Sequence, residues 1–114
     1  MRSVFFAIFL VGGVLLSNVA QASNADWGYI SVIIGTRGGA VLFNSSGGRT
    51  PRPGCQTPGL DTRWALDGTT VSGQAQIAIL LNAYNMHKKV TIVGNHGCTA
   101  WPDTETVEFF TVQD

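Results

Sequence analysis

Residues 71–87, VSGQAQIAILLNAYNMH, restrict the fold most, because they predict one helix in a chain of short strand-like runs. Apolar side chains recur at helical spacing at Ile77, Leu80 and Tyr84, and polar residues occupy only a narrow stripe. One face should cover the domain's own sheet, which leaves a second face for another copy or another protein. The alternative is a helix buried deeply in its own core. The outward residues expected at an oligomer contact are Gln74, Ile79, Asn82 and Met86.

The N-terminal segment has the pattern of a cleavable secretory signal. A positive charge at Arg2 precedes a mostly apolar run over residues 4–16, and the segment ends in Ala20-Gln21-Ala22. The run is too short for a comfortable membrane span, so we expect cleavage after Ala22, with a retained anchor as the alternative. The product would be a single domain of residues 23–114, secreted or periplasmic, with no later membrane span.

The charge balance excludes some partners. Without Arg2, the 7 basic residues of the full chain become six, against 7 acidic ones. This near-neutral balance argues against a nucleic-acid protein or a polybasic membrane binder. A surface with so few charges suits recognition of a neutral polar ligand or burial in an assembly.

Cys55 and Cys98 are the only 2 cysteines, and in an exported chain they predict a disulfide. In the chain-entropy model such a bond contributes roughly 3–4 kcal/mol, a large share for a domain with a small core. Neither cysteine lies in a C-x-x-C pair, and His87 and His96 are scattered. We therefore expect no metal site and no cofactor.

The remaining regular elements should be strands. Alternating or β-branched runs predict them at residues 27–36, 40–44, 63–67, 90–93 and 105–112. In the first strand Ile30, Val32 and Ile34 should share a buried face. In the last strand Val107 and Phe109 should lie on one face, with Phe110 and Val112 on the other. Five strands with a helix between the third and fourth match the OB barrel. An open α+β sheet with one covering helix is the alternative.

Residues 45–62 predict an irregular loop, because they hold three of the 4 prolines and much of the glycine. A loop of this length is usually functional or disordered. Its basic residues Arg49 and Arg52 are candidates for ligand binding, and a solvated loop is the alternative.

Four pieces of the sequence resemble a known family. They are Trp27-Gly28, Cys55 after a Pro-rich loop, RWALD before a Gly-containing helix, and CTAWPDTETV before the last strand. Together they resemble small exported proteins related to the B subunit of subtilase cytotoxin. The similarity spans most of residues 27–112, and its most distinctive part is Cys98-x-x-Trp101-x-Asp103-x-Glu105. The resemblance implies an OB-like fold and, in toxin members, a ring of five that binds sialylated glycans beside an A subunit.

The segment after Cys98 carries the candidate chemistry. Asp103 and Glu105, near His96, could form a general acid/base pair or part of a metal site. Alternatively, Asp103 caps a turn and Glu105 pairs with Arg63 or a backbone amide. The candidate ligand-binding residues are Trp101, Asp103, Glu105, His96, Arg49 and Arg52.

Aromatic residues suggest a sugar-binding platform. Trp101, with Trp27 and Tyr29, could stack on the apolar faces of sugars. The alternative is that Trp101 packs over the disulfide.

The sequence contains no nucleophile elbow, P-loop or H-E-x-x-H motif, so we expect a protein that is not an enzyme. The leading hypothesis is an exported ligand-binding domain that recognises glycans as a homo-oligomer, such as a pentamer, with an unidentified A subunit as a further partner. The second is an exported envelope, interaction or inhibitor protein of the same fold without sugar affinity. The third is a small hydrolase that uses Asp103, Glu105 and His96.

Overall fold

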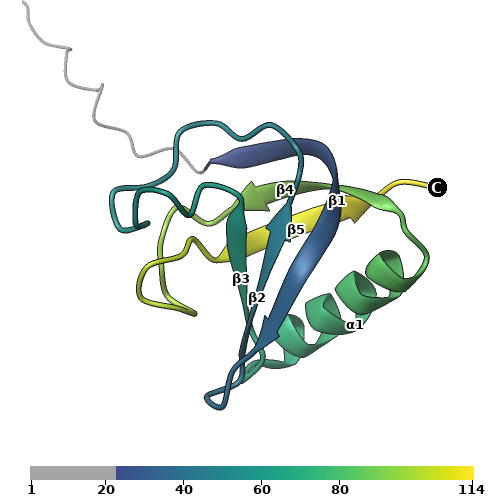
Figure 1. The fold of residues 1–114 in the computed structure, drawn as a ribbon. Helices are drawn as coiled ribbons and strands as arrows, with labels where there is room; N and C mark the ends of the chain where they lie inside the picture. Colours follow the sequence, from purple (N-terminus) through teal and green to yellow (C-terminus); the bar gives the residue numbers. More distant parts are fainter. Residues whose placement is uncertain (1–22) are drawn as a thin grey trace, which may run out of the picture.

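The computed structural model describes residues 23–114, and the expected signal segment, 1–22, lies outside the described residues. The elements follow the predicted order of three strands, one helix and two strands (Figure 1). They are β1 (Asn24–Gly35), β2 (Ala40–Ser45), β3 (Arg63–Asp67), α1 (Val71–Asn85), β4 (Lys89–Gly94) and β5 (Val107–Val112).

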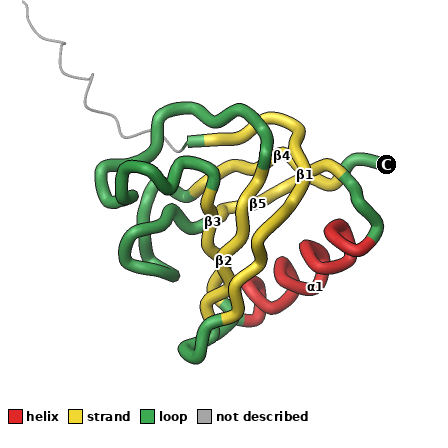
Figure 2. The backbone as a smooth tube through the Cα atoms, in the orientation of Figure 1, coloured by secondary structure: helices red, strands yellow, loops and turns green. Residues whose placement is uncertain are grey.

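The strands form one antiparallel sheet in the order β3-β2-β1-β4-β5. The long central strand β1 pairs with β4 through its first half and with β2 through its second half. At the two ends of this order, a single parallel bridge joins Ala65 of β3 to Thr106, just before β5. The helix α1 packs against β1 and β3, so the mainly β fold with one covering helix is confirmed (Figure 2).

A bulge in β1 overturns the predicted alternation of its apolar residues. Ile30 is buried, but Val32 and Ile34 are 60% and 40% exposed. The register with β2 shifts between Ser31 and Ile34, and Val32 has a φ of 49°, which is rare for a β-branched residue. An extra residue in one strand reverses the side-chain alternation beyond it, which the sequence pattern did not reveal.

A similar irregularity affects β5. The prediction that Val107 and Phe109 lie on one face is wrong, because Val107 is buried and Phe109 is 54% exposed. Gly94 of β4 lies opposite Val107, while the preceding Val93 lies opposite Phe109. Two residues along β5 therefore span one residue along β4, and the side chains of Val107 and Phe109 point to different faces of the sheet.

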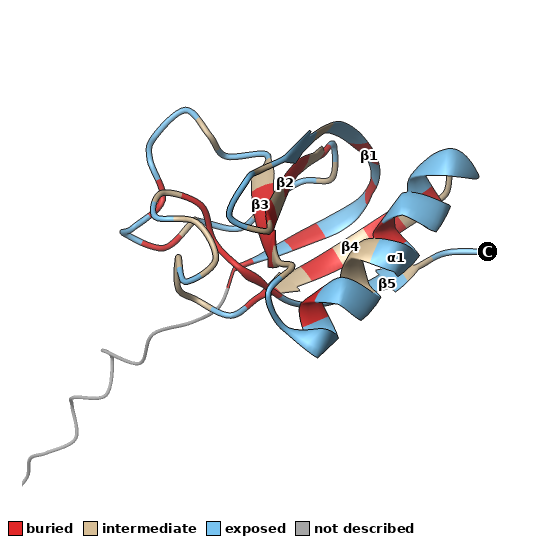
Figure 3. Cartoon of the chain, turned by 90° about the horizontal axis from the view of Figure 1, so that it is seen from below, coloured by how far each residue is buried: buried red, intermediate tan, exposed pale blue. Residues whose placement is uncertain are grey.

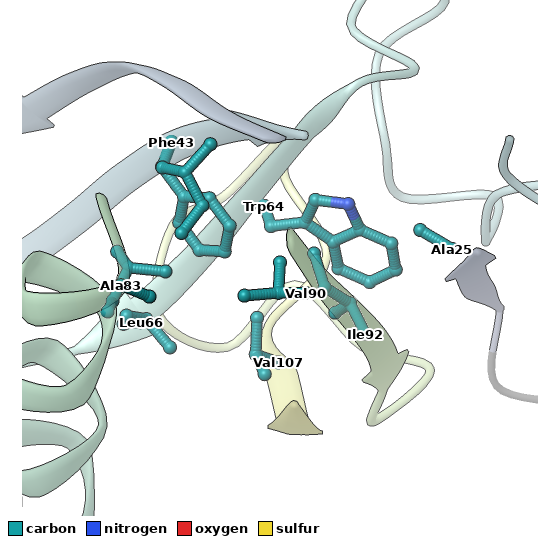
Figure 4. Close-up of a cluster of buried hydrophobic side chains, with 10 residues drawn as sticks. Ala25, Phe43, Trp64, Leu66, Ala83, Val90, Ile92 and Val107 are labelled. Atoms are coloured by element: carbon teal, nitrogen blue, oxygen red, sulfur yellow. The ribbon is translucent and has the colours of Figure 1, made fainter. Parts of the chain in front are cut away.

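The core lies between the sheet and α1. Its largest fully buried apolar side chains are Trp64, Phe43, Leu66, Leu80 and Ile92 (Figure 4). Trp64 and Leu66 are two residues apart on β3, so they share a face, and both enter this core. All five strands and one face of the helix thus contribute side chains to the core.

The start of α1 has a side-chain cap and a close backbone approach. Thr70 is the N-cap, and its side-chain oxygen accepts a hydrogen bond from the Gly73 amide at 2.9 Å. Gly73 is buried, and a Cβ there would overlap the carbonyl oxygen of Asp67, so the close approach requires glycine. The helix ends at Asn85, two residues earlier than predicted, and His87 has a φ of 55°.

Only one face of α1 is buried in the single chain. Gly73, Leu80 and Ala83 are the buried positions, and most of the helix surface is exposed (Figure 3). The alternative of a helix enclosed by its own core is therefore wrong. The exposed large apolar side chains of the helix and its C-cap are Val71, Ile79, Leu81, Tyr84 and Met86.

Candidate functional site

A disulfide joins the two long loops of the structure. Cys55 and Cys98 are bonded, as predicted, with their Cα atoms 6.1 Å apart. The amide of Thr57 also donates to the carbonyl of Asp103 at 3.1 Å. We call residues 46–62 and 95–106 the loop cluster; they lie beside each other at the end of the sheet away from α1 (Figures 1 and 2).

Glu105 lies at the buried centre of this cluster. Its carboxylate Oε1 accepts a hydrogen bond from the Arg49 guanidinium at 2.7 Å and another from the Ser23 hydroxyl. Its Oε2 accepts from the backbone amide of His96 at 2.9 Å and from that of Ser23 at 3.4 Å. The predicted pairing with a backbone amide is confirmed, whereas the pairing with Arg63 is wrong. These partners compensate a carboxylate whose burial without them would be very unfavourable.

Arg49 is fixed on several sides at once. Its side chain is 6% exposed, and its guanidinium carbon lies 3.8 Å from the ring centroid of Trp64, a cation–π contact. It also donates to the carbonyls of Asp61 and Arg63, at 2.8 and 3.0 Å. Burial lowers the pKa of Arg49, and the nearby Glu105 opposes this shift. The Arg49 side chain therefore points into the domain, where its hydrogen bonds hold the loop of residues 46–62 against Glu105.

Gln56 connects the ion pair to the backbone of the loop. Its side-chain oxygen accepts from Arg49 at 3.0 Å and from the Glu105 amide at 2.8 Å. Its side-chain nitrogen donates to the carbonyls of Leu60 and Arg63. Sequence reasoning missed Gln56 and Ser23; the one available signal for Gln56 was its place next to Cys55.

The other charged candidates lie nearer the surface. Asp103 accepts from Arg63 at 2.6 Å, and its side chain is 41% exposed. Arg52 pairs with Asp61 at 3.1 Å, where both side chains are more exposed than those of the buried pair. Asp103 and Arg52 thus keep part of their polar surface open to a ligand.

The structure does not place Asp103, Glu105 and His96 as one catalytic group. Asp103 and Glu105 belong to separate ion pairs, and His96 contacts Glu105 through its backbone amide. Glu105 is fully buried and so is closed to a substrate. Residues 23–114 contain no group of three or more His, Cys, Asp or Glu side chains arranged to hold a metal ion.

The aromatic candidates fall into two places. The ring of Tyr29 on β1 stacks on His87, with centroids 4.4 Å apart, and the Lys89 ammonium lies 5.4 Å from the Tyr29 centroid. Trp27, also on β1, is exposed. Trp101 belongs instead to the loop cluster, where it is half-buried and its carbonyl accepts from Thr104 at 3.2 Å. Tyr29 therefore has His87 as its stacking partner.

Comparisons with known proteins supply no relative. No family model, curated protein or solved structure matches the chain. Within residues 23–114, α1 is too short and insufficiently apolar to cross a membrane. Any functional assignment therefore rests on the chain's own residues.

Proposed function

We propose that the protein is an exported, non-enzymatic ligand-binding domain, similar to a toxin B subunit, that recognises glycans as a homo-oligomer. The observation that carries this proposal is the exposed apolar surface of α1 and its C-cap, where Ile79 and Met86 are 52% and 58% exposed. A helix that is apolar on nearly every side is normally buried on every side. A second copy of the chain would remove this surface from water, which favours association.

The topology supports an OB-like barrel. The sheet, with the strand order β3-β2-β1-β4-β5, would close into a barrel if its two end strands, β3 and β5, paired with each other. The bridge between Ala65 and Thr106 lies where these two strands would meet. The Ala65 amide donates to the Glu105 carbonyl there at 3.0 Å. A helix between the third and fourth strands agrees with the same architecture.

The loop cluster is the proposed glycan-binding surface. Trp101 would stack on the apolar face of a sugar, while Asp103, His96 and Arg52 would bind its polar groups. The disulfide and the buried pair of Arg49 and Glu105 hold this surface in one shape. A site fixed before binding loses less conformational entropy when the ligand arrives.

A glycan array probed with the processed protein tests the ligand. Sialylated glycans should give signal, and Trp101→Ala should weaken binding about tenfold or more, equivalent to about 1.4 kcal/mol. Trp27→Ala is the matched control, because Trp27 is an exposed tryptophan outside the loop cluster and should leave binding unchanged. Equal losses in the two variants would contradict the proposed surface.

One observation favours the second candidate, an exported interaction or inhibitor protein without sugar affinity. Two of the six expected ligand-binding residues, Arg49 and Glu105, form a buried ion pair with each other and so are not free to bind a ligand. A blank array from a verified oligomer would support this candidate. A neighbouring gene for a toxin-like A subunit would support the first.

A further inference from the structure

Ser23 is the residue that would follow the expected cleavage site, and it is buried at the centre of the domain's polar network. It is only 2% exposed. Its hydroxyl donates to Glu105 Oε1, its nitrogen lies 3.4 Å from Glu105 Oε2, and its carbonyl accepts from the Gly94 amide at 2.8 Å. Such a position is unusual for a residue that becomes a chain terminus, because ends are commonly poorly ordered unless they are tied down.

We propose that removal of residues 1–22 sets the new α-ammonium group of Ser23 against Glu105, so that signal cleavage itself completes the buried ion-pair network. Hydrolysis of the bond between Ala22 and Ser23 consumes one water. Its oxygen leaves with the Ala22 carboxylate, and its two hydrogens go to the Ser23 nitrogen. A neutral amide with one N–H donor thereby becomes a cation with three.

The two oxygens of Glu105 explain why this change would stabilise the fold. Oε1 already faces the guanidinium of Arg49, but Oε2 accepts only from the backbone nitrogens of His96 and Ser23. An ammonium donor adds the attraction of opposite charges to the hydrogen bond that a neutral N–H already makes to a carboxylate. The ammonium would supply the charged donor that Oε2 lacks.

Three charged or titratable residues belong to the hydrogen-bond network around Ser23. Glu105 attracts the ammonium directly, while the Arg49 guanidinium, whose Nη2 lies 3.4 Å from the Ser23 hydroxyl, repels it. The backbone amide of His96 donates a hydrogen bond to the same Oε2, and the imidazole Nδ1 of His96 is buried without a hydrogen-bond partner. Attraction to Glu105 should outweigh this repulsion, because the Ser23 nitrogen hydrogen-bonds directly to Glu105, whereas Arg49 contacts the Ser23 hydroxyl. The other N–H groups of Arg49 point at the Asp61 and Arg63 carbonyls and the Gln56 side chain.

The pairing has a pH signature of definite sign. An exposed α-amino group has a pKa of about 7.7–8.0, and a buried carboxylate partner should raise it. A raised pKa in the folded state contributes stability that is fully present below about pH 8. This contribution is lost as pH rises through the folded-state pKa.

The test uses the full chain, exported and processed. N-terminal sequencing should show Ser23 as the first residue. In the matched variant, one glycine inserted between Ala22 and Ser23 moves the ammonium by one residue and changes no side chain. At pH 7 the folding equilibrium constant should fall about tenfold, as for a pKa difference of one unit, and the difference should vanish above about pH 10.

A second comparison identifies Glu105 as the partner. In the Glu105→Gln background, the glycine insertion should have little effect. Should Glu105→Gln fail to fold, the amine pKa measured by NMR in the native chain should be about one unit higher than in the insertion variant. A mature chain that begins elsewhere, equal stability of the two proteins at pH 7, or equal amine pKa values would overturn the proposal.

Discussion

Replacing Glu105 with glutamine should be the most damaging conservative change in the loop cluster. The carboxylate accepts four hydrogen bonds, from the Ser23 hydroxyl and from the nitrogens of Ser23, Arg49 and His96. Glutamine keeps the shape of the side chain but has one acceptor oxygen instead of two. Its NH₂ group would replace the other oxygen and would face N–H or O–H groups that also donate. It also leaves the buried guanidinium without its counter-charge. Breaking a buried pair by removing one partner costs about 3–5 kcal/mol.

That loss is large for a domain of this size, whose total stability is expected to be about 5–14 kcal/mol. Urea unfolding followed by tryptophan fluorescence measures it, since Trp64 stacks on Arg49. The matched control is Asp103→Asn, which breaks a pair of similar length, 2.6 Å, whose carboxylate is 41% exposed. Exposed pairs contribute only about 0–1 kcal/mol.

The double variant Arg49→Met with Glu105→Gln should lose less stability than the sum of the two single variants, because it leaves no unpaired charge inside. If Glu105→Gln cost no more than Asp103→Asn, the buried pair would not organise the loop cluster. Simple additivity in the double variant would equally refute the reasoning.

Three further predictions concern the disulfide, the helix and the loss of stability at acid pH. Cys55→Ser and Cys98→Ser should lower stability equally, by roughly 3–4 kcal/mol, with the double mutant no worse in thermal unfolding; unequal losses would contradict a shared bond. Ile79→Lys should dissociate the oligomer in light scattering while circular dichroism stays native; unfolding instead would place this residue in the monomer's core. Hydrogen bonds from the Thr69 side chain and amide lower the pKa of Asp67, so their stabilisation is present above about pH 4 and is lost as pH falls. Asp67→Asn should therefore flatten this part of the acid unfolding curve, and an unchanged curve would exclude the effect.

Features that depend on neighbouring residues in the chain could be predicted from the sequence. The strand of residues 63–67 was predicted with the bounds of β3, and helical spacing gave α1 to within two residues at its end. The cap at Thr70 and the close packing at Gly73 follow from local chemistry in the same way. The disulfide followed from having only two cysteines in a chain that we expect to be exported.

Features that depend on distant residues could not be predicted. Apolar alternation along β1 and β5 gives no sign of the bulges that expose Val32 and Phe109. The sequence also could not choose the partner of Glu105, because Arg49 and Arg63 offer the same guanidinium. The actual partner lies 56 residues away and is selected by the path of the loop.

We propose that further copies of the chain cover the exposed apolar side of α1. Sedimentation equilibrium of the processed protein, over a series of concentrations, tests it most directly. We predict a discrete mass that is a multiple of the single chain, with five copies expected from the resemblance. A native, folded protein that sediments as one copy even at the highest concentration would contradict the account.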